Sequence, residues 1–147
     1  MSRMIFVNLP VSDLAASRRF LEALGATNES KFTDETAACM KISDTIFTML
    51  LTHDKFRQFT PRPVADATAS SQVLLCLSAD SRESVDTTVE RAVLAGGTAD
   101  PAAKQDYGVM YGRSVADPDG HIWEIMWMDA AAAQAGASAV EEAANAQ

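Results

Sequence analysis

The sequence has few of the residues that build metal sites, disulfide frameworks and nucleic-acid surfaces. Among 147 residues there are two histidines and two cysteines. Cys39 and Cys76 lie inside strand patterns and lack the spacing of metal ligands, so we interpret both as small buried hydrophobes. Basic residues number 12 against 20 acidic ones, which gives a net charge of −8. This charge disfavours nucleic acids and anionic membranes as partners, because both select basic surfaces.

Long hydrophobic runs are also missing from the sequence. No stretch approaches the roughly 18 apolar residues that a membrane-spanning helix needs, and residues 1–4 do not begin a signal peptide. Together with the low cysteine content, this predicts a cytoplasmic protein. A hydrophobic fraction of 48% over 147 residues is typical of a single globular domain.

What the sequence does contain is an internal repeat. Residues 46–50 (IFTML) follow a polar turn, and residues 122–126 (IWEIM) follow a second polar turn. Large apolar residues match between the two copies, but Thr48 stands where Glu124 stands. Such a repeat predicts two similar modules that share one core.

The segments upstream of these copies also match. The apolar runs 5–11 and 73–77 are of strand type, and each leads into a helical pattern. The first helix is predicted from a cap at Ser12 or Asp13 to a stop at Gly25, and the second from Asp80 or Ser81 to Gly96. The order predicts two βαβββ modules in an α+β fold with one curved mixed sheet.

The boundaries follow from composition. We predict a single domain over residues 1–129, with module one at about 4–59, a linker at about 60–70 that contains two prolines, and module two at about 71–129. The segment 53–59 is predicted to form a short helical turn before the linker. The alanine-rich tail, residues 130–147, is predicted to be a frayed helix or a disordered end.

The two modules, the sequence VSDL at 11–14 and the sequence DPDGHIWE at 117–124 resemble the vicinal oxygen chelate superfamily. This superfamily includes glyoxalase I, extradiol dioxygenases, and fosfomycin and bleomycin resistance proteins. The resemblance implies a cup with a ligand or a divalent metal on its concave side. It also implies a homodimer, because members commonly dimerise and exposed strand edges need cover.

In the metal-dependent members, four positions supply the ligands. Matching through the motifs places these positions at Phe6, Thr48, Leu74 (or Val73 if the register differs by one residue) and Glu124. Only Glu124 is a good ligand, whereas a catalytic metal usually takes about three protein ligands. His53 follows a strand and His121 lies in a turn that we expect to point to solvent. We therefore predict neither a cofactor nor a metal bound in the family's usual way.

Strand alternation predicts the rest of the pocket. Glu124 should face the cup with Ile122 and Met126, and by the repeat Thr48 and Leu50 should do the same. The predicted pocket residues besides Glu124 are Phe6, Asn8, Thr48, Leu50, Leu74, Cys76, Tyr111, Arg113 and Met126.

Three interpretations of Glu124 follow from this pocket. Burial favours the neutral form of a carboxylate, so Glu124 could act as the general base of a glyoxalase-like lyase or isomerase, with Tyr111 or Arg113 as the nearby polarising group. It could instead bind a small organic ligand that has an apolar body and a cationic or hydrogen-bonding group. Finally, it could be a structural residue that is satisfied by Tyr111, Thr48 or water.

Overall fold

A computed structural model describes residues 2–146 of the chain, and its elements fall into two successive groups. The first group contains β1 (Ile5–Val11), α1 (Leu14–Ala23), β2 (Thr27–Asn28), the 3-10 turn η1 (Ser30–Phe32), β3 (Ala37–Lys41) and β4 (Ile46–Thr52). After α2 (His53–Arg57) and a linker, the second group contains β5 (Leu75–Ser78), α3 (Arg82–Leu94), β6 (Thr98–Ala99), β7 (Gln105–Asp106), β8 (Met110–Ala116) and β9 (Ile122–Met128). Two helices follow, α4 (Ala130–Ala135) and α5 (Ala137–Asn145).

The two long helices begin and end where the sequence signals predict. The Asp13 side chain caps α1 by accepting from the backbone N–H of Ala16, and Ser81 caps α3 through a reciprocal capping box with Ser84. Gly25 and Gly96 follow the helix ends with φ of +104° and +102°. Glycine adopts this left-handed conformation without the steric cost that other residues bear.

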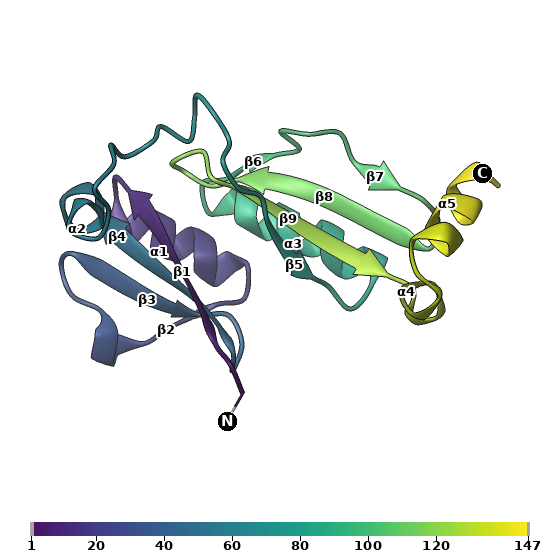
Figure 1. Ribbon diagram of the computed structural model, residues 1–147, viewed down its shortest axis with the longest axis horizontal. Helices are drawn as coiled ribbons and strands as arrows, with labels where there is room; N and C mark the ends of the chain where they lie inside the picture. Colours follow the sequence, from purple (N-terminus) through teal and green to yellow (C-terminus); the bar gives the residue numbers. More distant parts are fainter. Residues whose placement is uncertain (1, 147) are drawn as a thin grey trace.

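The strands form two mixed sheets that lie side by side (Figure 1). The strand orders are β1-β4-β3-β2 and β5-β9-β8-β6, with β7 paired to β8. In each sheet the first strand pairs in parallel with the last, and the other pairs are antiparallel. The α+β class and the two βαβββ modules are thus confirmed. The predicted continuous sheet is divided, because no strand among residues 2–146 pairs across the two modules.

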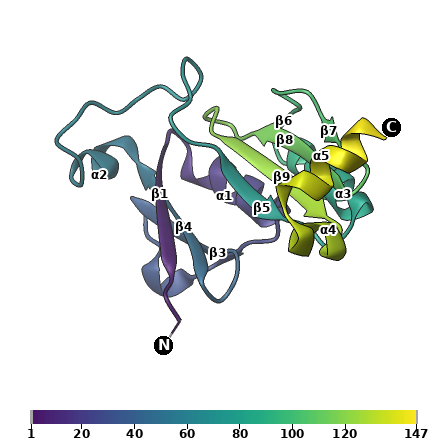
Figure 2. The same ribbon diagram turned by 45° about the vertical axis from the view of Figure 1, so that its right-hand side comes forward.

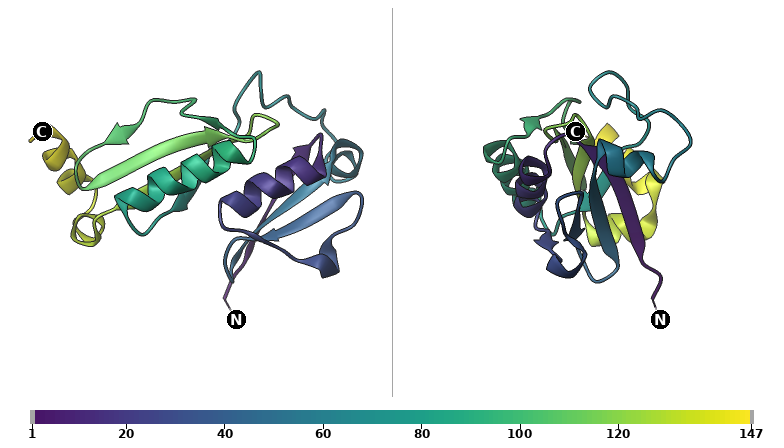
Figure 3. Two further views of the ribbon diagram at one scale, coloured as in Figure 1. Left: turned by 180° about the vertical axis from the view of Figure 1, so that it is seen from behind. Right: turned by 90° about the vertical axis from the view of Figure 1, so that its left-hand side faces the viewer.

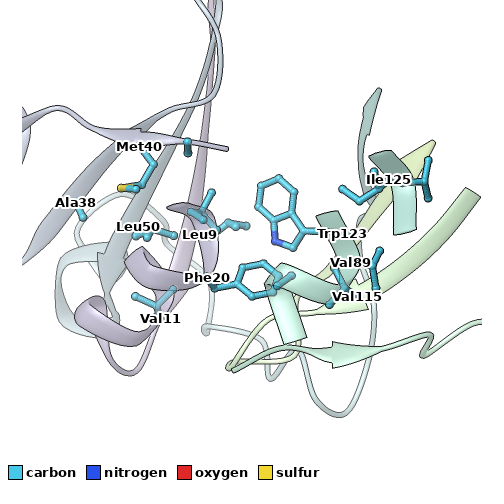
Figure 4. Close-up of a cluster of buried hydrophobic side chains, with 14 of the residues drawn as sticks. Leu9, Val11, Phe20, Ala38, Met40, Leu50, Val89, Val115, Trp123 and Ile125 are labelled. Atoms are coloured by element: carbon cyan, nitrogen blue, oxygen red, sulfur yellow. The ribbon is translucent and has the colours of Figure 1, made fainter. Parts of the chain in front are cut away.

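Both long helices cover the same side of the two sheets, so the opposite side is open (Figure 3). The side chains between helices and sheets form one core that includes residues of both modules. Figure 4 shows Trp123 of β9 lying between Leu9 of β1 and Val89 of α3, with Phe20 of α1 close by. Phe20, Val89 and Trp123 are at most 2% exposed, so burial of large side chains at this junction holds the modules together.

The turn between β8 and β9 also joins the modules. Asp119 accepts from the backbone N–H of Ser12 at 2.9 Å and from Ser17 Oγ at 3.3 Å. Nε2 of His121 lies 2.8 Å from the Pro10 carbonyl oxygen. The expectation that His121 points to solvent is therefore wrong, because the turn is docked on the β1–α1 junction.

The remaining segments are α2, the linker and the alanine-rich tail. α2 confirms the predicted helical turn, and the linker crosses the β8–β9 turn, where a Cβ at Gly120 would meet Ala67 backbone atoms at 3.0 Å. The alanine-rich tail contains α4 and α5, with Gly136 between them. Within residues 2–146 there is no helix long and apolar enough to cross a membrane.

Candidate functional site

A cavity of about 220 Å³ opens on the uncovered face of the second sheet. Cys76 of β5, Glu124 of β9 and Ser114 of β8 are register partners on three neighbouring strands. Partners in register point to the same face, so a thiol, a carboxylate and a hydroxyl stand in one row in the cavity. Met110 and Met126 add apolar surface to this row. The segment after β6 completes the lining with Ala102, Ala103 and Gln105.

Alternation along β9 exposes Glu124 to this cavity. Its neighbours Trp123 and Ile125 are each 2% exposed and face the helices, while Glu124 is half-buried on the other side. Cys76 is exposed, so the interpretation of this residue as a buried hydrophobe is wrong. Partial desolvation in the cavity, and to a smaller extent the charge of Glu124, raises the pKa of its thiol. The thiol is therefore protonated at neutral pH, and a protonated thiol is a poor nucleophile. In this row the carboxylate of Glu124 is therefore the group that can interact with a positive charge on a ligand.

Tyr111 and Arg113 do not project into the cavity, contrary to the prediction. They lie on the helix side of β8, where Tyr111 Oη donates to Asp86 of α3 at 2.7 Å. Arg113 borders the cavity, but its guanidinium donates to Asp86 at 3.0 Å and to Asp100 at 2.8 Å. Hydrogen bonds from Tyr111 and Arg113 lower the pKa of Asp86, and those from Arg113 lower the pKa of Asp100. This charge cluster anchors the segment after β6 to α3.

Thr48 and Leu50 are likewise absent from the open face. Both are buried in the core, at 1% and 0% exposure, and the predicted face of β4 is wrong. The register pairs Val7 with Thr48 and Leu9 with Leu50, so these residues lie under α1. The open face of β4 carries Phe47 instead.

The structure gives a different correspondence between the modules. Cys76 lies five residues before the α3 cap at Ser81, and Asn8 lies five residues before the α1 cap at Asp13. Cys76 pairs with Glu124, whereas Asn8 pairs with Met49. The place of the carboxylate is thus taken in the first module by Met49, one residue beyond Thr48.

The other predicted residues lie away from Glu124. Phe6 is on the open face of the first sheet, where its ring stacks on Phe47 with centroids 4.9 Å apart. Asn8 borders a separate cavity of about 460 Å³. Leu74 precedes β5 and is 56% exposed. That separate cavity is otherwise lined by Leu51, Phe56, Phe59 and Thr60.

Of the predicted pocket residues, Glu124, Cys76, Met126 and Arg113 border the Glu124 cavity, although the guanidinium of Arg113 is bound to aspartates behind the sheet. Sequence reasoning did not identify Ser114, Gln105 and Met110. Tyr111 and Arg113 of β8 were predicted to face the cup, whereas Gly112 and Ser114, which alternate with them, occupy that face. Gln105 follows an irregular segment for which periodicity gives no signal.

The comparisons with known proteins agree with this architecture. Residues 3–125 match the family model of the Glyoxalase/Bleomycin resistance protein/Dioxygenase superfamily. The chain therefore belongs to this superfamily. A search of curated proteins gave no match.

Several solved structures share the fold. A glyoxalase-related enzyme from Fulvimarina pelagi has a TM-score of 0.70 and 25% identity, with 86% of this chain and 88% of that chain covered. A glyoxalase/bleomycin resistance protein/dioxygenase family enzyme from Burkholderia phytofirmans has a TM-score of 0.69 and 20% identity, covering 86% and 99%. A lactoylglutathione lyase from Agrobacterium tumefaciens has a TM-score of 0.61 and 20% identity, covering 86% and 94%.

Proposed function

We propose that the Glu124 cavity binds a small organic ligand with an apolar body and a cationic or hydrogen-bonding group. The observation that carries this proposal is the row of Cys76, Glu124 and Ser114 on the open face of three strands. The methionines beside the row offer apolar, adaptable contact. The basic residue that borders the cavity, Arg113, is held by two aspartates on the other side of the sheet. Glu124 is thereby available for a ligand's positive charge or hydrogen-bond donor.

The superfamily also includes metal-dependent members, and the donor set of this chain does not fit a divalent ion. A catalytic ion usually takes about three protein ligands from His, Cys, Asp or Glu. Within residues 2–146, no group of three such residues is placed to hold a metal. The row at Glu124 offers one carboxylate, one protonated thiol and one hydroxyl. We therefore assign no step to a metal.

The alternative function is a glyoxalase-like lyase or isomerase with Glu124 as general base. The carboxylate in a cavity supports it, but proton abstraction next to a carbonyl also needs a group that stabilises the developing negative charge. Tyr111 and Arg113, which were the sequence candidates for that role, are bound to Asp86 behind the sheet. Gln105 is then the remaining amide donor in the lining.

The test is a calorimetric titration of small cationic aromatic compounds into the wild type and Glu124→Gln. A binding site predicts that the amide variant loses at least tenfold in affinity and keeps its melting temperature. Glu35→Gln, at an exposed position of the first module, is the matched control and keeps the wild-type affinity. Equal affinity in Glu124→Gln and wild type would contradict the proposal. Turnover of an α-hydroxy or α-keto thiol adduct that is lost in Glu124→Gln would instead support the lyase.

We also propose that the chain forms a homodimer through the free edges of its sheets. β1 pairs on one side with β4, and β5 pairs on one side with β9. These edges carry exposed apolar side chains, among them Ile5 at 56%, Phe6 at 49% and Leu74 at 56%. Exposed apolar edges favour association. Light scattering should give twice 15.7 kDa for the wild type and the monomer mass for Ile5→Asp combined with Leu74→Asp, and a monomeric wild type would exclude this assembly.

A further inference from the structure

The C-terminal helix α5 borders a second hollow next to the Glu124 cavity. Figure 1 shows α5 beside the ends of β8 and β9 that lie farthest from the first module, and Figure 2 brings it to the front. No side chain of α5 is fully buried. One stripe of the helix, at positions 137, 140, 141, 144 and 145, lines a groove of about 630 Å³. Tyr107, Met110 and Met128 form the other wall.

The groove adjoins the Glu124 cavity at Met110, which borders both spaces. The register pairs Ser114 with Glu124, Gly112 with Met126 and Met110 with Met128, and all six residues share the open face. From Ser114 to Met110 this face extends about 13 Å, at roughly 3.3 Å per residue. Between them Gly112 has no side chain to divide the space.

The charges along this face are complementary to an elongated cation. Glu124 lies in the cavity at one end, and Glu141 borders the groove at the other. The floor between them is apolar, because it is formed by Met110, Met126 and Met128. Within the described part of the chain, residues 2–146, the lining of the groove contains no basic residue, and the chain as a whole carries −8.

We propose that the groove under α5 is a second subsite and that the ligand is an elongated amphipathic cation. Its charged head lies at Glu124, and its aliphatic or aryl tail passes Met110 and lies under Val140 of α5. This inference rests on the proposed binding function of Glu124 and extends it by naming the ligand class.

The test is a calorimetric titration with ethyl-, butyl-, octyl- and decyltrimethylammonium salts below their micelle concentrations. Affinity should rise from butyl to decyl by up to about fourfold for each methylene that is buried. Ala144→Phe fills the groove and should remove this dependence while leaving the ethyl affinity unchanged. Ser138→Phe lies on an exposed position of the same helix, outside the groove, and should keep the wild-type series. Val140→Ser keeps the helix and should reduce the gain per methylene.

The outcomes separate the subsite from the site itself. If the short cations bind in a Glu124-dependent way but affinity does not change with chain length, the subsite is excluded and the binding function stands. The same holds if Ala144→Phe retains the chain-length dependence. If no cation in the series binds in a Glu124-dependent way, the binding function fails and the subsite with it. Melting curves of each variant exclude loss of folding as the cause.

Discussion

Thr48 gives the sharpest physical test of the structure, because the sequence and the structure assign it opposite environments. Its side chain is 1% exposed, and the hydroxyl oxygen has no hydrogen-bond partner among residues 2–146. A buried polar group without a partner costs about 1–3 kcal/mol. Thr48→Val replaces the hydroxyl with a methyl group of similar size and keeps the β-branched shape that suits a strand. The variant should therefore be more stable than the wild type by about 1–2 kcal/mol.

The assay is urea and thermal denaturation followed by tryptophan fluorescence and circular dichroism. For a chain of this size, 1 kcal/mol corresponds to roughly 2–4 °C in melting temperature, so a rise of about 2–8 °C is expected. Thr27→Val is the control, since Thr27 lies exposed on β2. That control should change stability by less than about 0.5 kcal/mol. A loss of stability in Thr48→Val would refute the buried position. Unchanged stability with altered ligand binding would indicate that the Thr48 side chain faces the cup.

Two further predictions concern the contacts that hold the fold. Asp119→Ala removes the two hydrogen bonds that join the β8–β9 turn to Ser12 and Ser17, so it should lower the free energy of unfolding by about 1–3 kcal/mol. Asp44→Ala, at an exposed turn, is the control. Equal urea midpoints for the two variants would contradict a stabilising role for these two hydrogen bonds. Acid should also destabilise the protein, because Arg82 lowers the pKa of Asp106 to about 2, against about 3.9 in the unfolded chain. The native state then binds fewer protons than the unfolded state, so this contribution is complete above pH 4 and is lost as the pH falls towards 2. Urea midpoints at pH 6, 4 and 3 should decrease less steeply in Arg82→Gln, and an identical pH slope in the variant would contradict this assignment.

The fold could be predicted because its local signals are strong. Residues 5–11 form β1 with the predicted bounds, and Asp13, Ser81, Gly25 and Gly96 delimit the helices as capping rules require. The division into two sheets could not be predicted in this way, because pairing across modules depends on how the modules pack. Val73 and Leu74 illustrate the same limit. Their apolar character predicts a strand from residue 73, but β5 begins at Leu75.

The site was less predictable because a shift of one residue in the alignment of a strand reverses which of its side chains face the cup. On β9 the bulky Trp123 and Ile125 fixed the buried side, so Glu124 was assigned to the open face. On β4 both faces are apolar, and aligning the two copies by their turns moved Thr48 to the wrong face. The position of Arg113 could not be predicted for another reason. Its partners Asp86 and Asp100 are distant in sequence, and only the packed structure brings them behind the sheet.

The most direct test of the proposed site is a calorimetric titration of Zn²⁺, Ni²⁺, Mn²⁺ and Fe²⁺ into the purified, untagged protein, with elemental analysis of the same sample. The row of Cys76, Glu124 and Ser114 predicts no stoichiometric ion whose binding depends on Glu124. One ion per chain that is lost in Glu124→Ala would contradict the account and would make metal-dependent glyoxalase or dioxygenase chemistry the leading function.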